Sequence, residues 1–389
     1  MTHLGIDLAQ LRAGRLARLQ AAMRERGVDL CLLFNEPNIR YATGVSTMPI
    51  WSETTFVRCA LVPAEGVPIL FEHPNSIHRA RRIAPDVRPM HAWEFTDDPE
   101  GEAAVFVREV LGAARELGAV PDRLAVDRLG TPGLLALLRE GVSLTDSSPV
   151  TCAAREVKTV EEVRLLELNG AIVSDLLSAF EATVAPGVRE CDLLAVLADR
   201  LLRHGGEYLA TSTVCSGPNT NPWRAEATAR ALEPGDLVFV DTDAVGVEGY
   251  FFCVSRTFLC GDVRPTPAQR EVFGVAYEWL SRMLDLIRPG VTCRELAERA
   301  PRLPEAYRPQ RYEVMVHGIG LEEESPSVAY PEDRQPNPDR VLVEGMALVV
   351  ELYAGAAGAR DGVKLGEQVL VTANGARVLA PFPYDPALR

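Results

Sequence analysis

Two stretches decide the fold of this chain: Gly235-Asp236-Leu237-Val238-Phe239-Val240-Asp241 and Gly345-Met346-Ala347-Leu348-Val349-Val350-Glu351. In each, a glycine leads into a short apolar strand that ends on a carboxylate six residues later. A carboxylate at the end of a buried strand is costly unless a cation, a proton or a hydrogen-bond donor compensates it. The duplication therefore predicts a symmetric acidic site, and the function should be sought there.

The composition is that of a globular chain. Its 389 residues, 47% of them hydrophobic, are enough for two or three domains with substantial cores. The formal net charge of -14 argues against a nucleic-acid surface, because counterion release needs clustered Lys and Arg. We interpret the short arginine-rich run at residues 78–82 as a solvated helix face.

Cysteine usage and the absence of an apolar leader indicate the compartment. The eight cysteines form no CxxC pair and are sparse for a chain of this length, which is typical of a reducing environment. Residues 1–4 lead directly into an amphipathic segment, and no stretch approaches the length of a membrane span. The sequence therefore predicts a cytoplasmic protein with neither a membrane nor a nucleic acid as its partner.

Residues 1–153 are predicted to form a compact α/β domain without a catalytic motif of its own. Helical periodicity over residues 8–26 leads into a buried strand at 30–34, and two strand-like runs within 55–71 suggest a hairpin. Helices at 102–117 and 132–139 flank a short strand at 124–126. Residues 149–157 are a plausible junction to the second domain.

Residues 154–389 repeat one pattern twice. Helix-like residues 172–183 lead through Pro186-Gly187 to a second helix near 191–202, and residues 275–287 lead through Pro289-Gly290 to a helix from 293. Each unit then supplies a strand, a carboxylate-ending strand and a hairpin partner at 251–259 or 362–372. Neither unit can bury its strands alone, so the repeat predicts one pseudo-twofold domain with a shared curved sheet.

At this level the chain resembles the creatinase, prolidase and aminopeptidase P family, whose catalytic domain has the pita-bread fold. The resemblance covers nearly the whole chain and rests on the order and spacing of Val316-His317-Gly318-Ile319-Gly320, Glu351-Leu352-Tyr353, Ser255-Arg256-Thr257-Phe258 and Gly362-Val363-Lys364-Leu365. Residues 216–223 and Asp241-Thr242-Asp243 are most similar to the branch that contains dimethylsulfoniopropionate lyases. The fold class implied is α/β (α+β), with a creatinase-like N-terminal domain before a pita-bread domain.

Metal-dependent members of this family hold two divalent ions with five side chains, and the bridging carboxylates screen the repulsion between the ions. The resemblance implies Asp241, with Asp243 as an alternative, His317 and Glu351 as three of these ligands. The two bridging positions depart from the family pattern. One falls on Cys253 and the other on Gly366, with Glu367 one residue further along.

Three explanations of these departures remain open. A local bulge would let Glu367 act as the last ligand, although successive strand side chains face opposite ways. Cys253 as a thiolate would suit zinc or iron better than a bridged manganese site. The third explanation, which we prefer, is that the paired-metal site has been lost, since creatinase-like members work without metal. No cofactor is therefore favoured, and Mn, Zn or Fe remains an alternative.

Without metal, the chemistry must come from side chains. His317 is the natural general acid or base, and Asp241 or Glu351 would orient it or bind a cationic substrate. Two more candidates are implied by the lyase-like branch. These are Tyr312, five residues before His317, and Glu323, six residues after it. Alternatively, each is a plain strand or loop residue.

Four residues are candidates for substrate binding. Trp223 and Arg224 follow a turn-rich segment and are expected to line the pocket, although tryptophan is most often a core residue. The resemblance implies that Trp51 is lent across a homodimer interface. Cys253 is either a nucleophile activated by His317 or a buried structural cysteine.

The preferred function is an enzyme that cleaves a small amino-acid-like or betaine-like molecule, by hydrolysis of a C–N bond. A metal-dependent Xaa-Pro peptidase is the main hydrolase alternative. A C–S lyase on the same scaffold is a different reaction class, and a non-catalytic binding protein is a third. The expected partners are a small-molecule substrate and a second copy of the chain.

Overall fold

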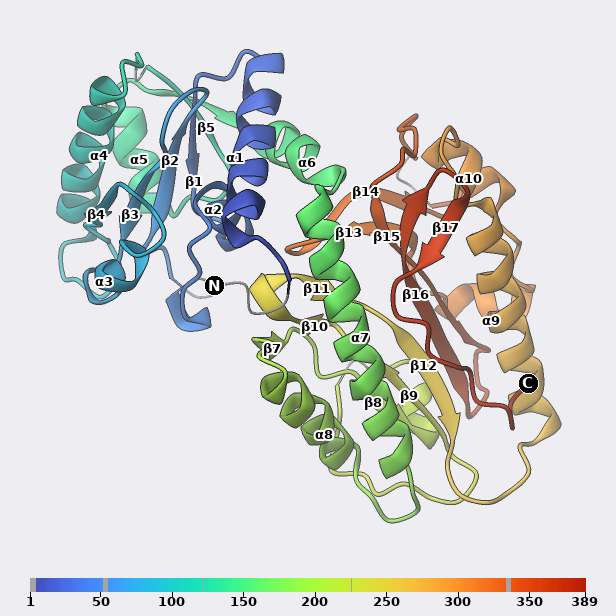
Figure 1. Cartoon of the computed structure of the whole chain (residues 1–389). Coiled ribbons are helices and arrows are strands. Elements are labelled where there is room, and N and C mark those ends of the chain that lie inside the picture. Colours follow the sequence, from blue (N-terminus) through green and yellow to red (C-terminus); the bar gives the residue numbers. More distant parts are fainter. Residues whose placement is uncertain (1–4, 52–54, 121, 225, 334–336) are drawn as a thin grey trace. The chain divides into compact units, whose positions relative to one another are not determined.

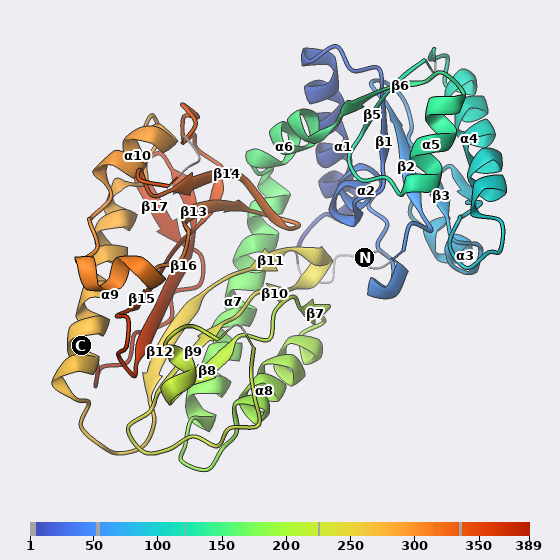
Figure 2. The ribbon, with the colours of Figure 1, turned by 180° about the vertical axis from the view of Figure 1, so that it is seen from behind.

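The computed structural model describes residues 5–51, 55–120, 122–224, 226–333 and 337–389. It divides into two compact units, Met1–Arg155 and Glu156–Arg389. Figures 1 and 2 show their helices and strands from opposite sides. The sequence placed the boundary after residue 153, in a segment interpreted as a junction. That segment contains the helix α6 (Ser148–Glu156), and the boundary between the two units falls within it.

Unit 1 is an α/β domain around a mixed sheet with the strand order β4-β3-β2-β1-β5-β6. β1 pairs antiparallel with β2 and parallel with β5, and its residues are buried. The strands are β1 (Leu30–Leu33), β2 (Cys59–Pro63), β3 (Ile69–Glu72), β4 (Val87–Pro89), β5 (Arg123–Val126) and β6 (Ser143–Asp146). The main helices are α1 (Leu8–Glu25), α2 (Glu36–Thr43), α3 (Ile77–Ala80), α4 (Pro99–Glu116) and α5 (Thr131–Arg139).

Unit 2 contains the predicted repeat. Its helices are α7 (Val160–Thr183), α8 (Glu190–Arg203), α9 (Pro267–Leu286) and α10 (Cys293–Arg299). Its strands are β7 (Tyr208–Leu209), β8 (Val214–Ser216), β9 (Leu237–Asp241), β10 (Ala244–Val245), β11 (Phe251–Phe252), β12 (Ser255–Leu259), β13 (Val314–Ile319), β14 (Glu323–Ala329), β15 (Ala347–Gly355), β16 (Gly362–Thr372) and β17 (Gly375–Val378). β7, β10 and β11 form a small separate sheet.

The large sheet of unit 2 is symmetric about its centre. Its order is β14-β13-β15-β16-β12-β9-β8, with β17 beside β16. The hairpin partners β15 and β16 on one side mirror β9 and β12 on the other, and β13 mirrors β8. This order confirms the pseudo-twofold domain that the repeat predicted.

The strand register places both carboxylates in one row across the four central strands. Asp241 of β9 stands opposite Ser255 of β12, Ser255 opposite Gly366 of β16, and Gly366 opposite Glu351 of β15. Residues directly opposite each other in a ladder share a face of the sheet. The two halves of the repeat therefore present their acids to one common site.

The outer face of the large sheet packs against helices, and the site lies on its inner face. On β15, Leu348, Val350 and Leu352 join Trp279 and Met283 of α9 in a buried apolar cluster. Because side chains alternate along a strand, Glu351 projects from the opposite, inner face. In Figure 1 the long helix α9 lies beside β15 and β16, whereas α7 and α8 lie on the side of the β8–β9 half.

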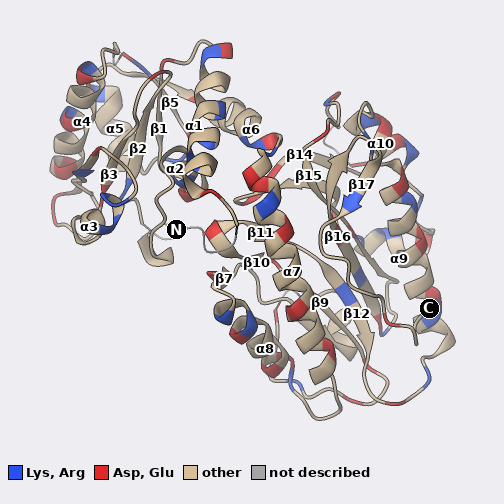
Figure 3. Cartoon of the chain, viewed as in Figure 1, with Lys and Arg blue, Asp and Glu red and all other residues tan. Residues whose placement is uncertain are grey.

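Charge is spread over the helices. Figure 3 shows Asp and Glu interspersed with Arg along α4, α8 and α9. Among the described residues, no helix has both the length and the apolar character needed to cross a bilayer.

Candidate active site

A lysine ammonium lies between the two carboxylates of the repeat. Lys364 Nζ is 2.5 Å from Asp241 Oδ2 and 2.8 Å from Glu351 Oε2. All three side chains are buried. Lys364 reaches them because it lies two residues before Gly366 on β16, and so on the same face of that strand. The charges of Asp241 and Glu351 outweigh burial and hold the pKa of Lys364 well above its usual value.

Two aromatic rings enclose the same ammonium. Lys364 Nζ lies 4.7 Å from the ring centroid of Trp223 and 4.4 Å from that of Tyr312. The two rings are tilted against each other with centroids 5.4 Å apart. Cation–π contacts of this kind are strongest where water is excluded, so the rings stabilise the charge from the sides that carry no carboxylate.

His317 supports Glu351 from the neighbouring strand, β13. Its Nδ1 donates to the Gly318 carbonyl oxygen at 2.9 Å, and its Nε2 lies 3.5 Å from Glu351 Oε1. Burial lowers the pKa of His317, but Glu351, Glu323 and the Gly318 carbonyl raise it above its ordinary value overall. Burial likewise raises the pKa of Glu351, but Lys364 and His317 together lower it to about 2.

Ser255 and Cys253 fix the other carboxylate, Asp241. Its Oδ1 accepts a hydrogen bond from Ser255 Oγ at 2.9 Å and one from the Cys253 thiol at 3.3 Å. Burial and the charges of Asp241, Asp243 and Glu351 raise the pKa of Cys253 well above its usual value. Cys253 is therefore a protonated donor, and only a thiolate is a good nucleophile or metal ligand.

Asp243 is the second acid on this side of the site. Its backbone has φ +28°, in the left-handed region, and its Oδ2 accepts a hydrogen bond from Thr211 Oγ1 at 2.8 Å. Burial and the charge of Asp241 raise the pKa of Asp243 to about 7. Asp243 thus changes charge near neutral pH.

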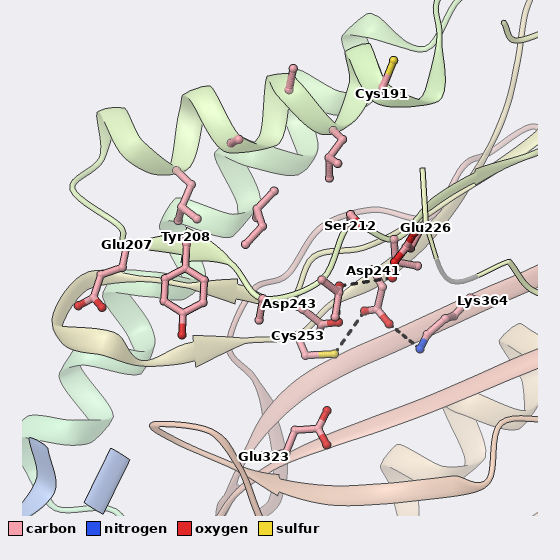
Figure 4. A pocket seen from close by; sticks show the side chains of 18 of the residues that line it. Cys191, Glu207, Tyr208, Ser212, Glu226, Asp241, Asp243, Cys253, Glu323 and Lys364 are labelled. Atoms are coloured by element: carbon pink, nitrogen blue, oxygen red, sulfur yellow. Dashed lines mark hydrogen bonds and ion pairs between the residues drawn. The ribbon is translucent and has the colours of Figure 1, made fainter. Parts of the chain in front are cut away.

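A cavity of about 820 Å³ within unit 2 is lined by Asp241, Asp243, Glu351, Lys364, Cys253, Trp223 and Tyr312. One wall is the apolar face of α8, which contributes Leu194, Ala195, Ala198, Leu201 and Leu202. Figure 4 shows this helix, which carries Cys191, on one side of the cavity and Glu323 on the other, with Asp243, Cys253 and Asp241 between them. The cavity therefore combines an apolar wall with an acidic floor.

Comparisons with known proteins assign this chain to a family. Residues 164–373 match the model of metallopeptidase family M24, and residues 15–157 match the creatinase/prolidase N-terminal domain. The chain belongs to metallopeptidase family M24. The predicted architecture of a creatinase-type domain followed by a pita-bread domain is thereby confirmed.

The M24 relatives include both a lyase and peptidases. The chain is 33% identical to the dimethylsulfoniopropionate lyase DddP of Roseovarius nubinhibens, over 98% of this chain and 88% of that protein. The crystal structure of the dipeptidase PepE from Mycobacterium ulcerans superimposes with a TM-score of 0.77 at 27% identity, covering 97% of this chain and 98% of that one. The prolidase of Pyrococcus horikoshii superimposes with a TM-score of 0.75 at 20% identity, over 95% and 99% of the two chains.

M24 enzymes usually use divalent metal ions, but the residues of this chain do not fit a pair of ions. Gly366 offers no side chain where the family pattern has a bridging carboxylate, and the Cys253 thiol donates to Asp241 at the other bridging position. Lys364 already occupies the space between Asp241 and Glu351. Asp241, Asp243 and Cys253 place ligand atoms within 4.8 Å of one another, so this cluster could hold at most a single ion.

The structure corrects the placement of Glu367. β15 and β16 pair without a register shift from Ala347↔Leu370 to Gly355↔Gly362, so no bulge turns Glu367 inward. Its Oε1 accepts hydrogen bonds from Arg256 and from the Tyr384 hydroxyl, each at 2.6 Å. Glu367 therefore belongs to a buried ion pair on the other face of the sheet.

The remaining predicted residues divide into two groups. Tyr312, Glu323, Trp223 and Cys253 line the cavity together with Asp241, Asp243 and Glu351. Among the described lining residues, neither His317 nor Arg224 is present. Arg224 is exposed, and its carbonyl accepts a hydrogen bond from the Cys215 thiol. Trp51 lies in unit 1, where its ring stacks on that of His73 with centroids 4.7 Å apart, and its role in a homodimer stays a prediction.

Lys364 was not predicted as a site residue, although it lies within the family motif Gly362-Val363-Lys364-Leu365. The available signal was its position two residues before Gly366, which places both on one face of a strand. Sequence reasoning also missed the apolar face of α8, which its i, i+3, i+4 and i+7 spacing could have shown.

Proposed function

We propose that this M24 member is a lyase that eliminates a neutral leaving group from a small substrate carrying an onium group, such as a sulfonium or quaternary ammonium propionate. The proposal rests on the residues at the two bridging positions that the family pattern implies: these are Cys253 and Gly366, and neither is a carboxylate. Hydrolysis in a two-metal site depends on a water held and activated between the ions. Elimination needs only a base and a place for the charges of the substrate.

The charges of the cavity support a cationic substrate. Asp243 and Glu323 face the cavity, and no ion pair to either is found among the described residues. The apolar side chains of α8 suit the methyl groups of an onium ion, while Asp243 balances its positive charge. The 33% identity to a dimethylsulfoniopropionate lyase over nearly the whole chain supports the same substrate class.

Three residues have roles in the proposed elimination. The Glu323 carboxylate takes a proton from the carbon next to the substrate carboxylate. The C–H electron pair becomes the carbon–carbon double bond, and the C–S or C–N bond breaks with its electrons leaving on sulfur or nitrogen. Burial raises the pKa of Tyr312, so its hydroxyl stays protonated and can donate to the substrate carboxylate. His317, which does not line the cavity, acts as a positioning residue for Glu351.

Hydrolysis of a C–N bond remains the second candidate. It is favoured by the identity to the probable dipeptidase PepE of Mycobacterium bovis, 28% over 97% of this chain. Glu351, which lines the cavity, is also the kind of group that binds a substrate amine. A cytoplasmic location and a homodimer stay predictions under either reaction.

Product analysis tests the proposal. The purified full chain is incubated with dimethylsulfoniopropionate, its trimethylammonium analogue, creatine or a glycyl-proline dipeptide, and the products are followed by proton NMR. The vinyl signals of acrylate together with a thioether or amine support a lyase. Cleavage of creatine or the dipeptide, with no acrylate from either onium substrate, overturns it.

A matched pair of variants tests the assignment of the base. Glu323→Gln should lower kcat by about 10²-fold or more, as expected when a general base is removed. Glu322→Gln, next to it in the chain but not among the described lining residues, should leave kcat unchanged. An equal effect of both variants would exclude Glu323 as the base.

A further inference from the structure

Lysine is almost absent from this chain, and its two lysines are both buried. Of the 40 basic Lys and Arg residues, only Lys158 and Lys364 are lysines. Both belong to unit 2, and both are paired with carboxylates: Lys158 with Glu324 at 2.5 Å, and Lys364 with Asp241 and Glu351. Arginine supplies the other 38 basic residues.

The surroundings of Lys364 explain why an ammonium is needed there. A guanidinium is a wide planar fork, whereas an ammonium is a compact point charge on a flexible stem. Carboxylate oxygens lie 2.5 and 2.8 Å from Nζ, and the ring centroids of Trp223 and Tyr312 lie at 4.7 and 4.4 Å, at a place where Lys364 also lines the cavity. The side chain of Lys364 is 1% exposed.

We propose that Lys364 is the resident cation of this active site and takes the place that metal ions hold between Asp241 and Glu351 in the two-metal pattern. It is a positioning residue: its ammonium neutralises and fixes both carboxylates, so that the site is assembled without metal. This inference concerns the architecture of the site and does not depend on whether the reaction is a lyase or a hydrolase reaction.

The other changes in the site agree with a single fixed cation. Two divalent ions need several anionic ligands, including bridging carboxylates. Here one bridging position is a cysteine whose thiol donates a hydrogen bond to Asp241, and the other is a glycine, which has no side chain. With both bridging acids gone, Asp241 and Glu351 are the two carboxylates in contact with the cation, and one ammonium touches both.

Because there are only two lysines, isotope labelling gives a direct test on the intact protein. A full chain labelled with ¹³C at lysine Cε should show two signals, which the variants Lys158→Met and Lys364→Met assign. We expect excess Mn²⁺ to broaden the Lys364 signal no more than the Lys158 signal, because no paramagnetic ion enters the site. Selective loss of the Lys364 signal at stoichiometric Mn²⁺ would overturn the proposal.

Metal uptake by the same variants provides a second test with no turnover in its readout. Removing the ammonium leaves Asp241, Asp243 and Glu351 facing one cavity without their cation. Folded Lys364→Met should therefore take up about one equivalent of Mn²⁺ or Zn²⁺ in equilibrium dialysis, because Asp241 and Asp243 place ligand atoms within 4.8 Å of each other. Wild type and Lys158→Met, which loses the other buried lysine, should take up none. Equal uptake by all three proteins would contradict the role of Lys364.

Discussion

Asp243→Asn should stabilise unit 2, and the gain should grow with pH. Burial and the charge of Asp241 raise the pKa of Asp243 from 3.8 to about 7. The folded chain therefore holds this proton more tightly than the unfolded chain does. The ionised carboxylate costs nothing well below pH 3.8, costs progressively more as the pH rises, and reaches its full cost above pH 7.

The magnitude follows from the two pKa values. The full cost is about 4 kcal/mol of unfolding free energy above neutral pH, and less than half of that applies at about pH 5. Asparagine can still accept the hydrogen bond from Thr211 and tolerates the left-handed backbone of this position. The advantage of Asp243→Asn over wild type should therefore be about 2–3 kcal/mol larger at about pH 8.5 than at about pH 5.

Hydrogen exchange in urea measures this difference in unit 2 alone. Peptides from β9 and β15 report the opening free energy of the sheet at each pH, separately from unit 1. Asp262 is exposed, so Asp262→Asn serves as the control and should leave the opening free energy unchanged at both pH values. The reasoning would be refuted if the stability difference between Asp243→Asn and wild type were the same at both pH values. It would also be refuted if Asp243→Asn were less stable than wild type at alkaline pH.

Three further predictions concern binding and packing. The KM for an onium substrate should rise as the pH falls below about 7, because Asp243 loses its charge, and steady-state kinetics should show this rise abolished in Asp243→Asn. Glu367→Gln leaves the Arg256 guanidinium buried without its partner and should cost about 3–5 kcal/mol in denaturant unfolding, with KM unchanged. Gly366→Glu places a Cβ 3.0 Å from Ser255 Oγ and should cost about 1–3 kcal/mol, measured in the same way, without metal uptake while Lys364 is present.

The sequence predicted the repeat well because the repeat is local. β16 spans Gly362–Thr372, the same residues that the repeat indicated as a hairpin partner, and the strands before Asp241 and Glu351 begin close to their glycines. A glycine turn followed by an apolar run is encoded within a few residues. The sharing of one sheet by the two units also followed, since neither unit can bury its strands alone.

The contacts across the sheet could not be predicted in the same way. Lys364 meets Asp241 because Gly366 is opposite Ser255 and Ser255 is opposite Asp241, and no local pattern specifies that register. The same register places Glu367 next to Arg256, whereas the sequence alone could not decide whether a local bulge turns Glu367 toward the site. His317 was predicted as a catalytic acid or base, but its burial behind Glu351 depends on the pairing of β13 with β15.

The most direct test of the central claim, that this M24 site works with a lysine cation in place of a metal pair, is the metal content of the full chain. The protein would be expressed in medium supplemented with Mn, Fe and Zn, purified without chelators and analysed by inductively coupled plasma mass spectrometry. We predict substoichiometric metal in preparations that turn over substrate, and unchanged turnover after dialysis against a chelator. Two equivalents of a divalent metal per chain, with activity lost on chelation, would contradict the account.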